Sequence, residues 1–187
     1  TRFLVHESIT KDFAAALARL DVLILPHADE SALVSGAFFE AIGAVSPENL
    51  APSPFGADRA GLWLGEAAPA VLLTAKGPWK ARYRGGATAG DGVHMTAPDR
   101  DAGGLCRAVH AALRMAQIEA AAVDWVSAHA TGTRFNDGME ATGFHKIFGD
   151  HPPVVHALKP VVGHTLGACG LVEVVTEMQL GLCSLQP

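Results

Sequence analysis

Two loops that each follow a stretch typical of a β-strand constrain the fold of this chain more than any other feature. The first loop, His129 to Thr133, follows an apolar stretch over 123–128, and the second, Lys159 to Ala168 with His164 near its centre, follows a similar stretch over 153–158. Because ligands in open α/β sheets meet residues just beyond the carboxyl ends of strands, His129 is well placed for chemistry. His129, His164 and Lys159 could converge on one carbonyl or carboxylate group. The pattern predicts an α/β fold with a candidate site at these two loops.

The rest of the chain continues the alternation of strands and helices. Short apolar runs predict strands, and apolar residues spaced three and four apart predict helices. Asp99 or Asp101 would cap one helix, and Asp137 followed three residues later by Glu140 would begin the next as a capping box. Strands are expected over 21–25, 70–73, 123–128 and 153–158, and helices over about 9–20, 99–117, 137–148 and 167–182, with a helix or helical loop over 31–50.

Three cations alternate along the glycine-rich stretch 77–92. Lys80, Arg82 and Arg84 would lie on one face of an exposed strand there. The ordinary interpretation is a solvated sheet edge protected by charge. The functional alternative is a patch that meets an acidic carrier protein.

Composition excludes several classes of function. A chain of 187 residues with 49% hydrophobic residues and a mean hydropathy of +0.23 can bury a core as one domain. Its net charge of -5 makes nucleic acid a poor partner, and its apolar windows are too short to span a membrane, so we expect a cytoplasmic protein. Three scattered cysteines, Cys106, Cys169 and Cys183, predict neither a disulfide framework nor a metal site.

Several motifs in one order resemble the β-ketoacyl synthases, the condensing enzymes of fatty acid and polyketide synthesis. His129–Thr133 is similar to the family's His-Gly-Thr-Gly-Thr element, and Lys159–Gly170 to its Lys-x-x-x-Gly-His-x-x-Gly-Ala-x-Gly element. Glu173 falls where the family carries a glutamate. Phe55–Glu66 and His94–Pro98 resemble two further family segments. Ordered motifs are far more specific than any single one.

The resemblance implies a thiolase-like fold of αβαβα layers, only partly represented by this chain. Residues 1–187 resemble a partial ketosynthase without its last segment. Residues 1 to about 70 would be the end of the N-terminal half, and about 70–187 most of the C-terminal half. Family members assemble as dimers, so the resemblance implies a homodimer or a heterodimer with another ketosynthase-like chain.

The resemblance also assigns the candidate catalytic residues. In this family two histidines hydrogen-bond the thioester carbonyl of a malonyl group while carbon dioxide leaves, and His129 and His164 match them. Two positioned N–H donors stabilise the developing enolate oxygen without moving a proton. Lys159 matches a lysine that orders the polar network, and Glu173 matches the partner that balances its charge.

Substrate recognition and partners follow from the same resemblance. Thr131 and Thr133 match residues that hydrogen-bond the pantetheine arm, which suits a short hydroxyl. The implied activity is that of an acyltransferase of the 3-oxoacyl-[acyl-carrier-protein] synthase type, which condenses malonyl-carrier with an acyl thioester. Its partner would be the acyl carrier protein, and no metal or cofactor is expected beyond the carrier's phosphopantetheine.

The family's cysteine nucleophile has no counterpart in the sequence. Counting back without gaps from 21–25 puts its position at or next to Thr1, where no cysteine stands. The cysteine could lie upstream or on another chain, or the chain could be a non-condensing partner similar to chain-length factors. A third alternative is that Thr1 acts as an N-terminal nucleophile. Both histidines and the lysine favour the first alternative, and the missing cysteine favours the second.

Overall fold

The computed structural model describes residues 23–26, 33–47, 50–94 and 97–181, which form two compact units. Among these residues, the first unit holds 23–26, 66–83 and 165–181, and the second holds 33–65 and 84–164. The helix expected over 9–20 lies outside the described residues. The first candidate loop lies wholly in the second unit, whereas the second loop is divided, because His164 is the last residue of the second unit and Thr165 belongs to the first.

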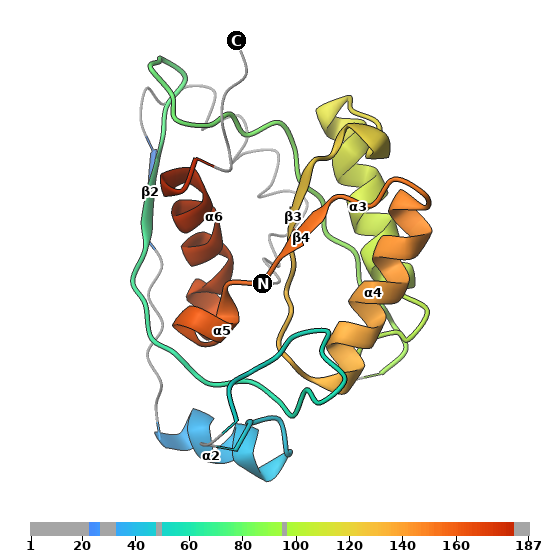
Figure 1. The fold of residues 1–187 in the computed structure, drawn as a ribbon. Helices are drawn as coiled ribbons and strands as arrows, with labels where there is room; N and C mark the ends of the chain where they lie inside the picture. Colours follow the sequence, from blue (N-terminus) through green and yellow to red (C-terminus); the bar gives the residue numbers. More distant parts are fainter. Residues whose placement is uncertain (1–22, 27–32, 48–49, 95–96, 182–187) are drawn as a thin grey trace. The chain divides into compact units, whose positions relative to one another are not determined.

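The first unit pairs two short strands and covers them with a helix. β1 (Leu23–Pro26) runs antiparallel to β2 (Ala70–Leu73), with Leu23 opposite Leu73. After the 3₁₀ turn η2 (Leu166–Ala168), helix α6 (Cys169–Gln179) packs against β2, as Figure 1 shows. The strands expected over 21–25 and 70–73 and the final helix are therefore confirmed.

The second unit is built around a parallel strand pair joined by a helix. β3 (Trp125–Ser127) lies beside β4 (Val154–His156), with Trp125 opposite Val154, and α4 (Arg134–Phe148) connects them. A strand, a crossover helix and a second parallel strand bring the carboxyl ends of both strands to the same edge. His129 leaves this edge after β3, and Lys159 leaves it after β4.

Helices complete the second unit. α3 (Gly103–Ala116) packs along α4, and both lie on the same side of the strand pair in Figure 1. The two helices approach closely at Gly143, where an added Cβ would come within 2.7 Å of Leu105 Cδ2. The short helices α2 (Leu33–Ala41), η1 (Ala120–Ala122) and α5 (Lys159–Val162) fill out the unit. Its buried apolar residues include Leu62, Ala102, Ala116, Ala128, Ala130, Ile147, Phe148 and Leu158.

The predicted N-cap of α3 is wrong, because Ala102 and neither Asp99 nor Asp101 is the N-cap residue, although Asp99 supports the helix start. The Asp99 carboxylate accepts hydrogen bonds from the N–H of Gly103 at 3.0 Å and of Asp101 at 3.0 Å. One of the donors that a helix start leaves without an intrahelical partner is thereby satisfied.

Two further local predictions are wrong. α4 begins at Arg134 with Thr133 as its N-cap, three residues before the predicted start at Asp137. Asp137 and Glu140 do not form a capping box, because their carboxylates accept hydrogen bonds from backbone N–H groups of the preceding loop.

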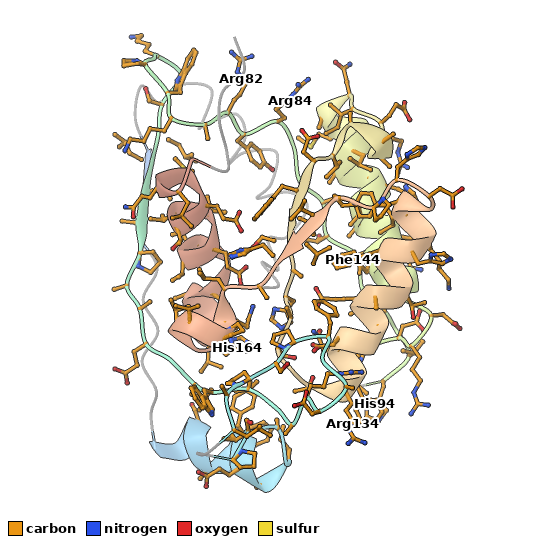
Figure 2. The ribbon with its side chains drawn as sticks, viewed as in Figure 1. Arg82, Arg84, His94, Arg134, Phe144 and His164 are labelled. Carbon is orange, nitrogen blue, oxygen red and sulfur yellow. The ribbon has the colours of Figure 1, made fainter. Side chains whose placement is uncertain are left out.

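The described part of 77–92 contains no strand, in keeping with its glycines and Pro78, which weaken strands. Arg82 stacks over Trp79 in the first unit, whereas Arg84 donates to the Ala116 carbonyl in the second. Figure 2 labels both arginines.

Within the described residues, no helix combines the length and the apolar character that crossing a membrane requires.

Candidate active site

The two predicted histidines meet in the second unit. The ring centroids of His129 and His164 are 5.1 Å apart, and the rings are nearly perpendicular at 83°. His129 follows β3, and His164, labelled in Figure 2, lies beyond α5. The structure therefore brings together the pair that the sequence proposed, from two loops separated by the whole of α4 and β4.

Backbone pairing with Trp63–Gly65 holds His164 in place. The His164 N–H donates to the Trp63 carbonyl at 2.7 Å, and the Gly65 N–H donates to the His164 carbonyl at 3.1 Å. Gly163 permits this close pairing, because an added Cβ would lie 2.8 Å from the Gly65 nitrogen and its φ of +75° favours glycine. His164 is 9% exposed and its backbone is fixed on both sides.

A buried carboxylate organises the loop that carries His129. The two Glu140 oxygens accept hydrogen bonds from the N–H of His129 at 2.6 Å and of Ala130 at 2.7 Å. The Asn136 side-chain amide also donates to Glu140, at 2.9 Å. Burial raises the pKa of Glu140, while the two backbone donors act in the opposite direction. A side chain that is 4% exposed thus fixes the turn from which the histidine projects.

A second buried carboxylate ties this loop to the Phe55–Glu66 motif. Asp137 accepts the N–H of Gly132 at 3.2 Å and, from 82 positions away, the N–H of Phe55 at 2.9 Å. Arg59 Nε lies 3.8 Å from the same carboxylate. The Gly61 N–H donates to the Gly132 carbonyl at 3.0 Å. Residues of the Phe55–Glu66 motif therefore hold the His129 loop in place through these contacts.

Lys159 supplies the positive charge of the site. It is 2% exposed and begins α5 directly beyond β4. The pKa of His129 falls from 6.5 to about 3, first because burial of the ring disfavours its charged form, then because of the Lys159 cation, and then because of His164. The His129 residue as a whole is nevertheless exposed to solvent. At neutral pH it is a neutral imidazole that can donate a hydrogen bond without giving up a proton.

The two candidate pantetheine residues lie in the same loop. The hydroxyls of Thr131 and Thr133 are 2.9 Å apart and hydrogen-bonded to each other. Thr131 is buried and Thr133 is half-buried. The loop turns sharply, with positive φ angles of 43° at Ala130 and 75° at Gly132. Each hydroxyl retains capacity for a further hydrogen bond to a ligand.

Glu173 belongs to a different unit from the other predicted site residues. It belongs to α6 in the first unit, where it accepts a hydrogen bond from Cys169 Sγ at 3.4 Å. His129, His164, Lys159, Thr131 and Thr133 all belong to the second unit. The structure places five of the six predicted residues in one unit and leaves the role of Glu173 a prediction.

Sequence reasoning missed the role of Asp137 and Glu140. Both were interpreted as a helix-capping pair, whereas their carboxylates accept hydrogen bonds from the N–H groups of the His129 loop. The signal that could have found them is a pair of acidic residues close behind a glycine-containing loop with several N–H groups to satisfy. Among the described residues, no group of three His, Cys, Asp or Glu side chains is arranged to hold a metal ion.

Sequence comparison identifies relatives of this chain. Residues 80–180 match the family model described as "Beta-ketoacyl synthase, C-terminal domain". The chain is 35% identical over 176 residues to the "Putative polyketide beta-ketoacyl synthase 1" of Streptomyces halstedii, covering 87% of this chain and 42% of the relative. It is 33% identical over 179 residues to 3-oxoacyl-[acyl-carrier-protein] synthase 2 of Coxiella burnetii, covering 83% and 43%. The chain thus spans less than half the length of these relatives.

Structural comparison agrees. A β-ketoacyl synthase from Burkholderia phymatum matches with a TM-score of 0.82 and 32% identity over 90% of this chain and 43% of the other. A Xenorhabdus doucetiae ketosynthase in complex with its chain length factor matches with a TM-score of 0.81 and 32% identity, over 90% and 41%. A type II polyketide acyl-carrier protein in complex with its ketosynthase matches with a TM-score of 0.79 and 28% identity, over 86% and 43%. The expected thiolase-like fold, partly represented, is confirmed. The chain belongs to the β-ketoacyl synthase family, and its residues 80–180 carry that family's C-terminal domain.

Proposed function

We propose that this chain carries the decarboxylating part of a condensing-enzyme site, which acts on a malonyl thioester held by an acyl carrier protein. The observation that carries the proposal is the pair of imidazoles 5.1 Å apart, of which His129 has its pKa lowered to about 3. Such a pair offers N–H donors to one carbonyl oxygen at neutral pH. A protonated pair would instead repel itself.

The chemistry follows from this arrangement. The malonyl thioester carbonyl accepts hydrogen bonds from the two imidazoles. The bond between the malonyl Cα and its carboxylate carbon then breaks, carbon dioxide leaves, and the electron pair forms an enolate whose negative charge lies on the thioester oxygen. Donors fixed in advance stabilise that charge at little reorganisation cost. The enolate carbon then attacks the carbonyl carbon of an acyl thioester, whose C–S bond breaks to release the thiolate, or takes a proton from water when no acyl group is present.

The surrounding residues position the reactants. Burial of the ring and then the Lys159 charge lower the pKa of His129 and keep it neutral, and Glu140 fixes the His129 backbone. Thr131 and Thr133 offer hydroxyls to the pantetheine arm. Glu173 is proposed to balance the Lys159 charge, as the family resemblance implies.

For the whole protein we propose β-ketoacyl synthase activity in fatty acid or polyketide synthesis, with the cysteine nucleophile supplied outside the 187 residues. The second candidate is a partner subunit similar to a chain length factor. It is supported by the likeness to a ketosynthase solved together with its chain length factor, and by Ala130 in place of the family's glycine. Either assignment makes the protein part of a dimer that receives substrate from an acyl carrier protein.

Carbon dioxide release from malonyl-carrier and from malonyl-pantetheine tests the decarboxylation proposal. We expect release above background with the unaltered chain, and a loss of about a hundredfold for His129→Ala and for His164→Ala, comparable to removal of an oxyanion donor. His145→Ala is the matched control, because His145 is exposed on α4. Equal release by the unaltered chain and both site variants would remove the proposal.

The condensation step separates the two candidate assignments. This chain is mixed with a subunit of a related ketosynthase whose cysteine carries an acyl group. If the chain is part of a synthase, the mixture should form a β-ketoacyl product, and this product formation should depend on His129. Product formation that persists unchanged in the His129→Ala variant would favour the partner-subunit assignment.

A further inference from the structure

Asp137 and Glu140 place two buried carboxylates against the His129 loop. Asp137 is 1% exposed and Glu140 is 4% exposed. Each accepts hydrogen bonds from backbone N–H groups of the loop, and an ionised carboxylate provides the acceptor oxygens for them. Two like charges that are buried near each other favour protonation of one of them. A donor group that contacts both carboxylates would offset this repulsion.

The side-chain amide of Asn136 is such a donor. Its Nδ2 atom donates to Glu140 Oε2 at 2.9 Å and lies 3.4 Å from Asp137 Oδ1, which is a longer and weaker contact. An amide NH₂ group carries two N–H donors on one atom, whereas a serine or threonine hydroxyl has one and an ionised aspartate has none. Asn136 therefore has the side chain that matches two carboxylate acceptors at this place.

The two oxygens that Asn136 contacts also hold the backbone of the loop. Glu140 Oε2 accepts the N–H of Ala130 at 2.7 Å, and Asp137 Oδ1 accepts the N–H of Gly132 at 3.2 Å. Ala130 and Gly132 have positive φ angles of 43° and 75°, a conformation that is unfavourable for alanine. The contacts of the amide therefore stabilise the sharp turn that these two residues make.

This turn carries two of the residues assigned to the proposed reaction. His129 directly precedes Ala130, and Thr131 lies between the two residues of positive φ. We infer that Asn136 is a positioning residue for the proposed decarboxylation, because its amide joins the two carboxylates that hold this turn. It acts through those carboxylates and not on the substrate. The inference rests on the proposed function, since it assigns a further residue to the same site.

The amide also favours the ionised form of Glu140. Burial raises the pKa of this carboxyl group, the N–H groups of Ala130 and His129 and then the Asn136 amide lower it, and the Asp137 charge raises it. A protonated Glu140 would turn an O–H group toward the loop and lose an acceptor for its N–H groups. Without the Asn136 amide the pKa of Glu140 should rise, so that acid weakens the turn at a higher pH than in the unaltered chain.

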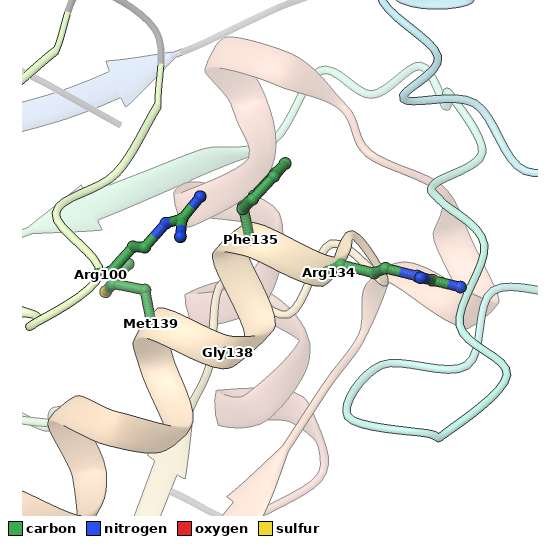
Figure 3. A pocket seen from close by; sticks show the side chains of 5 residues that line it. All are labelled: Arg100, Arg134, Phe135, Gly138 and Met139. Atoms are coloured by element: carbon green, nitrogen blue, oxygen red, sulfur yellow. The ribbon is translucent and has the colours of Figure 1, made fainter.

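Two variants of Asn136 remove the amide in steps. Asn136→Leu keeps a side chain of similar size without any donor, whereas Asn136→Ser keeps one hydroxyl donor. Met139→Ala is the control for lost packing on the same helix, because Met139 lines a hollow at the start of α4, shown in Figure 3, to which Asn136 does not contribute. The other charged or titratable groups of the site are unchanged in every protein: Arg59, Lys159 and His164.

Two measurements follow each protein from about pH 5 to about pH 9, the range in which a carboxyl group with a raised pKa titrates. The first is carbon-13 NMR of the glutamate carboxyl groups, with the Glu140 signal assigned by its absence from Glu140→Gln. The second is carbon dioxide release from malonyl-pantetheine, with kcat and KM determined separately. The NMR titration reports the state of Glu140 whether or not the chain is active.

We expect Glu140 to titrate at a higher pH in Asn136→Leu than in the unaltered chain, with Asn136→Ser between the two. At about pH 7.5, kcat of Asn136→Leu should fall about tenfold, as expected for the loss of one hydrogen bond to a charged group. KM should rise as well, because the turn carries both His129 and Thr131. The acid-side decline of release should begin at a higher pH in both variants, and Met139→Ala should keep the titration and the pH profile of the unaltered chain.

Three results would overturn the inference: an unchanged Glu140 titration in both variants, an equal shift in Met139→Ala, or a loss of release that is the same at every pH. The last result would show that Asn136 only fills space. If Asn136→Leu does not fold, Asn136→Ser decides by the same criteria. If the unaltered chain releases no carbon dioxide, the proposed function fails, and the NMR titration alone decides whether Asn136 supports the two carboxylates.

Discussion

His129 lies beside a buried cation and a second imidazole, and its backbone is fixed by a carboxylate. Lys159 and His164 both disfavour a charge on its ring, whereas Glu140 is bonded to its backbone N–H and to that of Ala130. The negative charge of the site therefore orients the histidine without forming an ion pair with its ring. This arrangement suits an N–H donor and does not suit a group that shuttles a proton.

Acid should destabilise the folded chain through His129. In the unfolded chain this residue titrates near 6.5, and in the folded chain its pKa is about 3. Between these values the unfolded state binds a proton that the folded state does not. The contribution of His129 to the free energy of unfolding is therefore greatest above pH 6.5 and decreases as the pH falls toward 3. Urea unfolding at about pH 7.5 and about pH 5 should show a smaller acid-induced loss for His129→Asn than for the unaltered chain.

Exposed His145→Asn is the control for that measurement and should leave the acid-induced loss unchanged. Glu140 acts with the opposite sign, because its raised pKa adds stability at low pH that is lost as the pH rises through its folded-state pKa. Since Glu140 is present in all three proteins, the comparison isolates His129. An identical pH dependence in His129→Asn would contradict the prediction.

Glu140→Gln should loosen the His129 loop. The amide keeps one acceptor oxygen and turns an NH₂ group toward a backbone donor, so one of the two N–H groups, at His129 or Ala130, loses its partner. We expect a loss of about 1–3 kcal/mol in unfolding free energy, the range for an unsatisfied buried group, together with reduced carbon dioxide release. Denaturant unfolding and the release assay measure the two effects.

Exposed Glu119→Gln is the matched control, because it makes the same substitution outside the site. A Glu140→Gln protein with the stability and activity of this control would show that the loop does not depend on the carboxylate.

Among the helices and strands, local sequence patterns predicted those elements that depend mainly on local interactions. The apolar runs around Trp125–Ser127 and Val154–His156 gave both parallel strands, because burial of such runs depends little on distant detail. The start of α4 was misplaced because a capping box and a carboxylate that reaches another loop have the same local spacing. The Phe55 N–H that Asp137 accepts lies 82 positions away, and no local pattern contains it.

Gly132→Ala should damage the contact between the His129 loop and Gly61. Its φ is +75°, and an added Cβ would lie 2.5 Å from the Gly61 carbonyl oxygen. Left-handed backbone costs an alanine about 1–2 kcal/mol, and relief of the contact would disturb the Gly61–Gly132 hydrogen bond. We expect a total loss of about 2 kcal/mol or more in the free energy of unfolding, measured with denaturant.

Gly138→Ala makes the same change inside α4, where nothing lies within 4 Å of an added Cβ. It should stabilise the chain by about 0.5–1 kcal/mol, because glycine weakens a helix interior. Equal effects of the two substitutions would show that the loop geometry at Gly132 is not what requires glycine.

For the molecule as a whole, the order of the motifs along the chain predicted which residues would form the site, beyond what the chemistry of each motif could show. His129, His164 and Lys159 were expected to converge, and the structure brings the two rings together with the lysine acting on His129. The division into two units was not predicted, because the boundary falls inside the second motif, between His164 and Thr165. Glu173 is thus assigned to another unit than the residues with which the resemblance groups it.

A double-mutant cycle should decide whether Glu173 acts together with Lys159 across this boundary in the sequence. If the glutamate balances the lysine charge, Glu173→Gln should reduce carbon dioxide release strongly in the unaltered chain and only weakly once Lys159→Met has removed the charge. We expect a coupling of about 1 kcal/mol or more between the two substitutions, since residues of one charge network are not additive. Cys169→Ala is the control, because Cys169 donates to Glu173 within the first unit. Its effect should be additive with that of Lys159→Met. Additive effects of Glu173→Gln and Lys159→Met, with coupling confined to Cys169 and Glu173, would show that Glu173 serves only its own helix.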